Sequence, residues 1–139
     1  MDFGYVGDVS PSSFNVPFIR DMLAGGIVPV FSPINHDGQG QLFNTNADTI
    51  AGSLAAALCA GLVYCFEKKG VLFDKDDENS VIPVLDNATY GKLRLEGRID
   101  KGMVPKLDNA FGAMQKGASR VVIKHALDLL EDSGTVLQD

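Results

Sequence analysis

NTNADTIAGSLAAALCAGLVYCFEKKG, residues 44–70, predicts a helix that leads directly into a strand. Asn46 is suited to cap a helix from Ala47 to about Ala60, and Asp48 lies in its first turn, where the helix dipole favours negative charge. The apolar run Leu62–Phe66 that follows is typical of a buried strand, and a polar, glycine-containing loop comes after it. This order of elements is typical of an α/β domain.

The same alternation extends in both directions along the chain. Further helices are predicted between Pro11 and Gly25, over residues 88–97, over Gly102–Lys116 and over Lys124–Glu131. Further strands are predicted over Tyr5–Val9, Ile27–Ile34, Val81–Leu85, Val121–Ile123 and Gly134–Leu137, with a hairpin tip at His36–Gly40 and a short extended piece at Phe43–Asn46. Alternating strands and helices predict a mainly parallel sheet with helices on both faces, a three-layer αβα sandwich. In such sheets ligands bind at the carboxyl ends of the strands.

Composition limits the classes of function. With 139 residues and 45% hydrophobic side chains, the chain suits one globular domain. Twelve basic against 18 acidic residues give a net charge of −6, which excludes nucleic acid as a partner but not ATP. The absence of a long apolar run and of a signal sequence predicts no membrane contact and a cytoplasmic location. Cys59 and Cys65, in apolar stretches, are expected to be buried, reduced thiols.

The common phosphate-binding motifs do not fit this sequence. Residues 112–119, GAMQKGAS, have the glycine spacing of a Walker A loop, but Ala118 stands where the lysine must be. Gly38 and Gly40 lack the third glycine of a dinucleotide-binding fingerprint, and no helix follows them. Any phosphate site must therefore be built from other residues.

Two polar segments are candidates for such a site. Asn44 and Asn46 project the same way from an extended segment and offer amide donors and acceptors to a small polar ligand, with Asp48 one turn further on. Simple capping of the helix is the alternative for this segment. In GMVPK, residues 102–106, Lys106 lies early in a helix, where a cation is unfavourable unless it faces an anion. A solvated lysine is the alternative there.

Several segments in this order identify the chain by its resemblance to a known family. They are Asp2–Val9, Ile27–Ile34, Phe43–Asp48, Lys69–Leu72 and Gly102–Lys106. Together they resemble the amino acid kinase family, and within it the members that phosphorylate N-acetyl-L-glutamate. The similarity spans nearly the whole chain, and the N-x-N-A-D element with GM-x-P-K downstream is specific to those members.

The resemblance implies ATP-dependent phosphorylation, with Mg²⁺, of the γ-carboxylate of N-acetyl-L-glutamate in arginine biosynthesis. It implies that Lys106 stabilises the transition state, that Asp48 orients lysines in the site, and that Asn44 and Asn46 hold the acetylated amino acid. It also implies that the nucleotide is bordered by Glu67, Lys68, Lys69, Gly70, Val71, Leu72, Arg98, Ile99, Asp100, Gly102 and Met103. No protein-held metal site is expected.

The resemblance has departures that leave alternatives open. Glu67-Lys68-Lys69 replaces the family's usual aspartate and small residues, and the stretch after Ile123 is shorter than usual. Family members also carry an N-terminal substrate lobe that contributes to their dimers, and nothing here matches it. We therefore expect residues 1–139 to be the ATP-binding C-terminal lobe of a homo-oligomeric kinase. The alternatives are a nucleotide-binding or interaction module without catalysis, and a kinase for another N-acylglutamate such as N-succinylglutamate.

Overall fold

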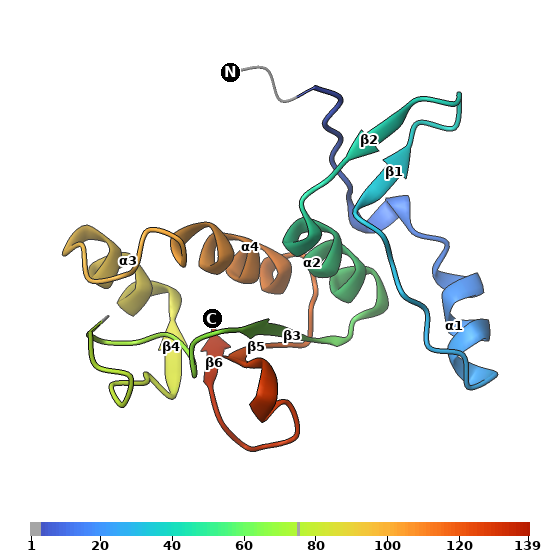
Figure 1. The fold of residues 1–139 in the computed structure, drawn as a ribbon. Coiled ribbons are helices and arrows are strands. Elements are labelled where there is room, and N and C mark those ends of the chain that lie inside the picture. Colours follow the sequence, from blue (N-terminus) through green and yellow to red (C-terminus); the bar gives the residue numbers. More distant parts are fainter. Residues whose placement is uncertain (1–3, 75) are drawn as a thin grey trace.

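The computed structural model describes residues 4–74 and 76–139, so Asp2 and Phe3 of the segment Asp2–Val9 lie outside the described residues. The elements in chain order are η1 (Pro11–Ser13), α1 (Val16–Ala24), β1 (Ile34–His36), β2 (Leu42–Asn44), α2 (Ala47–Leu58), β3 (Gly61–Phe66), β4 (Val84–Asp86), α3 (Asn87–Leu95), α4 (Val104–Gln115), β5 (Arg120–His125), η2 (Ala126–Asp128) and β6 (Thr135–Gln138) (Figure 1). The predicted alternation of helices and strands is confirmed.

Four strands form the main sheet, in the order β3-β5-β6-β4. β3 runs parallel to β5 over its whole length, β4 runs parallel to β6, and β5 and β6 are antiparallel. The sheet is therefore mixed but mainly parallel, as predicted, and β4 is an edge strand. β1 and β2 form a separate antiparallel hairpin around the predicted turn.

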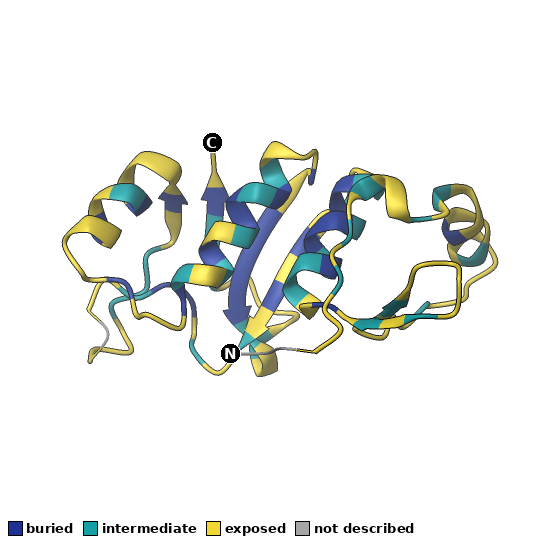
Figure 2. Cartoon of the chain, turned by 90° about the horizontal axis from the view of Figure 1, so that it is seen from above, coloured by how far each residue is buried: buried dark blue, intermediate teal, exposed yellow. Residues whose placement is uncertain are grey.

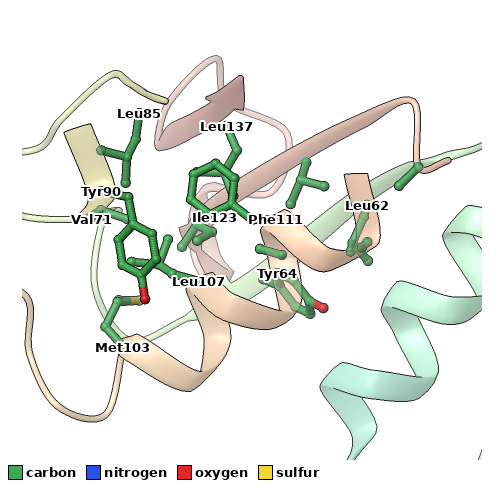
Figure 3. Close-up of a cluster of buried hydrophobic side chains, with 14 of the residues drawn as sticks. Leu62, Tyr64, Val71, Leu85, Tyr90, Met103, Leu107, Phe111, Ile123 and Leu137 are labelled. Atoms are coloured by element: carbon green, nitrogen blue, oxygen red, sulfur yellow. The ribbon is translucent and has the colours of Figure 1, made fainter. Parts of the chain in front are cut away.

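The hydrophobic core lies between this sheet and three helices. Leu62 and Tyr64 of β3 alternate with exposed neighbours, which shows that only one face of β3 is buried in the chain. Side chains from α2, α3 and α4 close over that face, and Leu107 of α4 and Ile123 of β5 are fully buried at its centre (Figure 3). One face of the sheet is thus covered by a helical layer.

The opposite face of the sheet carries little cover among the described residues. Val63 and Val84 are about half exposed there, whereas Lys124 is buried and donates hydrogen bonds to the main-chain oxygens of Leu129 and Glu131. These bonds fasten the loop that contains η2 beneath β5. Two helical layers were expected. The described residues supply one complete layer, and the opposite face carries only the short turn η2.

The segment before the hairpin departs most from expectation. Residues 27–34 were expected to form a strand buried on both faces, but only Ile34 belongs to a strand, and Val28 and Val30 are 82% and 94% exposed. A strand becomes buried only when neighbouring strands and a covering layer surround it. In the described chain only the end of this segment, at Ile34, pairs with a strand, β2. Figure 2 shows α1, the hairpin and the segment between them as mostly exposed.

Three smaller expectations were also wrong. Tyr5–Val9 forms an isolated bridge between Val6 and Asn44 rather than a strand. The predicted helix over Lys124–Glu131 is instead the end of β5 and the short η2, because pairing with β3 extends β5 through His125. Cys59 and Cys65 are free as expected but exposed: Cys59 ends α2 in the left-handed region, and Cys65 lies on the open face of β3.

Helix α3 begins at a carboxylate whose titration gives a test of the fold. Asp86 Oδ1 accepts a hydrogen bond from the main-chain nitrogen of Thr89 at 2.6 Å, and bonds from the Thr89 main chain and side chain lower the pKa of Asp86. A lowered native-state pKa stabilises the fold above the ordinary aspartate pKa, and the gain disappears as the pH falls through the native value.

We expect Asp86→Asn, which keeps a capping oxygen but does not titrate there, to lose less unfolding free energy than the parent between about pH 5 and pH 3. Urea unfolding at several pH values measures this difference. Equal losses in the two proteins would contradict a capping role for the Asp86 carboxylate.

Candidate active site

A cavity of about 510 Å³ opens beyond the carboxyl end of β3. Its walls are the loop that follows β3, the segment that leads into α4, and the first turn of α4. Its lining residues are Phe66, Glu67, Lys68, Gly70, Val71, Leu72, Asp76, Arg98, Ile99, Asp100, Gly102, Met103 and Lys106. The cavity therefore lies at the carboxyl end of a sheet strand, where a ligand is expected. Its volume falls within the range usual for small-molecule sites.

The structure brings together nearly all of the residues expected around a nucleotide. Of that set only Lys69 does not line this cavity; it borders a smaller one of about 230 Å³ on the other side of Glu67 and Lys68. Residues from two stretches more than 25 residues apart in sequence, within 67–72 and 98–103, thus line one cavity, while Lys101 does not line it. This juxtaposition comes from the packing of α3 and α4 over the sheet.

Lys106 lies in the first turn of α4 and lines the cavity. Its Nζ is 2.9 Å from Asp48 Oδ2, and Asp48 lies in the first turn of α2. The two side chains are about one-third and one-quarter exposed. The amino-terminal ends of two 12-residue helices therefore meet at one ion pair, and their dipoles add positive potential to the ammonium group. Such a place favours an anion.

Two aromatic side chains of β3 support this ion pair. The Lys106 ammonium lies 4.4 Å from the centre of the Phe66 ring, a cation–π distance. Tyr64 donates a hydrogen bond from its hydroxyl to the main-chain oxygen of Asp48 at 2.8 Å. Burial, and secondarily the Asp48 carboxylate, raise the pKa of Tyr64, so its hydroxyl remains a donor. Strand β3 thus fixes both partners of the ion pair.

The asparagines occupy the entrance to α2 rather than the cavity wall. The Asn46 side chain accepts hydrogen bonds from the main-chain nitrogens of Asp48 at 2.8 Å and Thr49 at 3.4 Å, which makes it the cap of α2. Asn44 ends β2, and its side chain is exposed. The capping alternative considered for Asn46 is therefore realised. The Asn46 side chain is nevertheless exposed, so its amide is still accessible to a ligand.

The segment that leads into α4 is held by its own polar groups. Asp100 Oδ1 accepts a hydrogen bond from the Gly102 main-chain nitrogen at 2.7 Å, and a Cβ on Gly102 would lie 3.1 Å from that oxygen. Arg98 pairs with Glu96 and places its guanidinium 4.6 Å from the centre of the Phe73 ring. These contacts orient the segment along the cavity and keep a positive charge at its rim.

Comparison with known proteins identifies the family. The sequence model of the amino acid kinase family matches residues 2–125. The chain belongs to the amino acid kinase family. Among curated relatives, it is 49% identical over 142 residues to the acetylglutamate kinase of Phocaeicola vulgatus, and 50% identical over 135 residues to that of Cytophaga hutchinsonii. These matches cover 99% and 94% of the chain.

The two matches cover 54% and 50% of those relatives, so the chain spans about half the length of the curated relatives it matches. Solved structures agree on the fold. A Streptococcus mutans protein, smu.665, superposes with a TM-score of 0.78 at 27% identity, covering 98% of this chain and 52% of that one. An N-acetylglutamate synthase from Neisseria gonorrhoeae gives 0.83 at 22% identity, covering 99% and 33%.

The sequence interpretation missed two residues of the cavity wall. Phe66 follows Leu62 and Tyr64 at a spacing of two, so strand periodicity places it on the same face as these core residues and could have indicated it. Asp76 belongs to the polar loop DKDDENS, residues 74–80, and no local pattern distinguishes it from its neighbours.

In the described part of the chain no helix is long and apolar enough to cross a membrane.

Proposed function

We propose that this chain is the nucleotide-binding part of an acetylglutamate kinase, which transfers the γ-phosphoryl group of ATP to the γ-carboxylate of N-acetyl-L-glutamate. The observation that carries the proposal is the position of Lys106, which lines the cavity and pairs with Asp48 where the amino termini of α2 and α4 meet. The identity to acetylglutamate kinases over the whole chain supports the choice of substrate.

The proposed reaction needs no general base. The carboxyl group of glutamate has a reference pKa of about 4.3 and is therefore ionised at neutral pH. Its oxygen attacks the γ-phosphorus while the bond from that phosphorus to the β,γ-bridging oxygen breaks, which yields an acyl phosphate and ADP. Two anions must meet for this to happen, so positioning and positive charge supply most of the catalysis. Lys106 would stabilise the charge that spreads over the transferred group, while Asp48 orients its ammonium.

Mg²⁺ fits this site as a companion of the nucleotide. Within the described residues no group of three or more His, Cys, Asp or Glu side chains could hold a metal ion. Magnesium in such enzymes is held largely by substrate phosphates with one or two carboxylates, and Glu67, Asp76 and Asp100 line the cavity as candidates. When bound, Mg²⁺ neutralises phosphate charge.

The amino acid would be recognised partly outside this cavity. We assign Asn44 and Asn46 to the edge of the amino acid site, Asn44 through its free amide and Asn46 through the amide nitrogen that capping leaves available. N-succinylglutamate is the alternative substrate to N-acetylglutamate. A panel of N-acylglutamates assayed with the working kinase decides between them.

A second polypeptide part belongs to the proposed kinase. The curated relatives are about twice as long as this chain, and the apolar side chains of Val28 and Val30 are almost fully exposed to solvent. A further lobe that packs on residues 27–34 would cover them, and it would supply groups that bind phosphate and the amino acid. Homo-oligomer formation by the whole kinase stays a prediction.

A nucleotide-binding module without catalysis is the second candidate, and the half-length match favours it for this chain alone. Two measurements separate the candidates. The first is calorimetric titration of the chain with Mg·ADP. The second is an ATP-coupled assay with a chimera in which the chain replaces the matching portion of the Phocaeicola vulgatus enzyme. Binding together with turnover by the chimera supports the kinase, and binding without turnover supports the module.

We expect Mg·ADP to bind the chain with one-to-one stoichiometry, and Arg98→Ala to weaken binding roughly tenfold, because it removes a charge at the cavity rim. Lys92→Ala, which removes an exposed charge from α3, is the matched control and should leave the affinity unchanged. Absence of binding to the parent chain would contradict both candidate functions.

A further inference from the structure

Thr135, the first residue of β6, is a buried polar residue that the proposed reaction does not use. Its side chain is fully enclosed, and its hydroxyl makes two hydrogen bonds to segments far away in sequence. Oγ1 accepts from the main-chain nitrogen of Val71 at 2.8 Å and donates to the main-chain oxygen of Ile82 at 2.7 Å. One hydroxyl thus joins β6 to both ends of the 71–82 segment.

Gly70 packs directly against the same hydroxyl. A Cβ added at Gly70 would lie 2.8 Å from Thr135 Oγ1 and 3.0 Å from Val81 Cγ1, so the main chain approaches β6 more closely than any side chain would allow. The main-chain nitrogen of Ile82 donates to the oxygen of Val71 at 2.8 Å, which closes the segment on itself. Three segments therefore meet at the Thr135 side chain.

Two of the residues held in this way form the cavity wall. Gly70 and Val71 line the cavity, and Val71 is 1% exposed. A serine or threonine hydroxyl can donate and accept at once, whereas an apolar side chain of the same size does neither. Replacement of Thr135 by valine would leave the buried Val71 nitrogen and the Ile82 oxygen without this partner, a state that favours displacement of the wall.

We propose that Thr135 is a positioning residue for the nucleotide: its hydroxyl holds Gly70 and Val71 against β6 and so sets the shape of the cavity wall. This inference rests on the proposed function, in which that cavity binds ATP. It extends the site to a residue that no motif of the sequence singled out.

The test compares Thr135→Val with Thr135→Ser in the 139-residue chain. Mg·ADP affinity is measured by calorimetry, and hydrogen exchange of the Val71 amide is measured by NMR. We expect the valine variant to bind Mg·ADP roughly tenfold more weakly and to exchange the Val71 amide at least tenfold faster. The serine variant, which keeps the hydroxyl, should stay within about threefold of the parent on both measurements.

Val122→Ala is the matched control because it removes buried apolar atoms from β5 at a position that pairs with Val63 of β3 and Val136 of β6, and not with the 70–82 segment. It should leave Mg·ADP affinity unchanged and speed Val71 exchange by no more than its measured loss of unfolding free energy accounts for. If Thr135→Val does not fold, Gly70→Ala disturbs the same contact from the loop side and should show both effects.

Parent-like Mg·ADP affinity in a folded Thr135→Val chain would overturn the inference, as would weakening of equal size in Val122→Ala. If the parent chain itself binds no Mg·ADP, the proposed function fails separately. The exchange rate of the Val71 amide then still decides whether Thr135 holds this wall.

Discussion

Lys106→Met in the chimeric kinase is expected to lower kcat by about 100- to 1,000-fold, the usual loss when a group that stabilises transition-state charge is removed. The Lys106 side chain lines the cavity, and its ammonium group is fixed by Asp48 at 2.9 Å and by the Phe66 ring. Methionine keeps most of the side chain's length and apolar contact but removes the charge. The measurement is the steady-state rate of acyl phosphate formation at saturating ATP and N-acetyl-L-glutamate.

The control for this variant is Lys101→Met, which removes an exposed lysine five residues earlier. Its kcat should stay within about twofold of the parent. Removal of the Lys106 charge also leaves Asp48 without its ion-pair partner, so the unfolding free energy of each variant is measured beside its rate. A folded Lys106→Met chimera that retains more than about a tenth of the parent kcat would contradict a transition-state role for Lys106.

Gly134→Ala is expected to destabilise the chain by about 3 kcal/mol or more, the range of severe local strain combined with overpacking. Gly134 has a φ of +97°, which L-amino acids rarely adopt. An added Cβ would also overlap the Ile123 carbonyl oxygen and lie 2.7 Å from Lys124 Cβ. Relief of this clash would move β6 away from β5.

Gly40→Ala separates the two causes of this effect. Gly40 has a similar φ of +101°, but nothing lies within 4 Å of its added Cβ, so alanine there suffers the backbone strain alone. We expect Gly40→Ala to cost about 1 kcal/mol. Urea unfolding of both variants gives the comparison. Equal losses would show that close approach of β6 to β5 does not govern stability at Gly134.

The sequence was most informative where local signals agreed with the tertiary structure. Asn46 caps α2 as predicted, and the apolar run after that helix became β3, because capping and periodicity act within a few residues. Residues 27–34 have the composition of a buried strand, yet they lie exposed in the described chain. Composition indicates what a segment can bury, whereas burial depends on what packs against it.

The candidate site shows the same difference between local sequence signals and contacts that depend on tertiary packing. Lys106 could be selected from sequence because a cation in the first turn of a helix is unfavourable without an anion nearby. Its pairing with Asp48, 58 residues away, required the packing of α2 against α4. Thr135 could not be selected, since its bonds to Val71 and Ile82 cross 64 and 53 residues of sequence and leave no local pattern.

The most direct test of the central claim is turnover by the chimera that carries this chain in the Phocaeicola vulgatus acetylglutamate kinase. The claim is that residues 1–139 supply a working nucleotide site to a kinase for N-acetyl-L-glutamate. We predict ATP-dependent formation of an acyl phosphate with N-acetyl-L-glutamate, trapped as its hydroxamate, at a rate within about tenfold of the unmodified enzyme. A folded chimera that binds Mg·ADP but forms no acyl phosphate would contradict the claim.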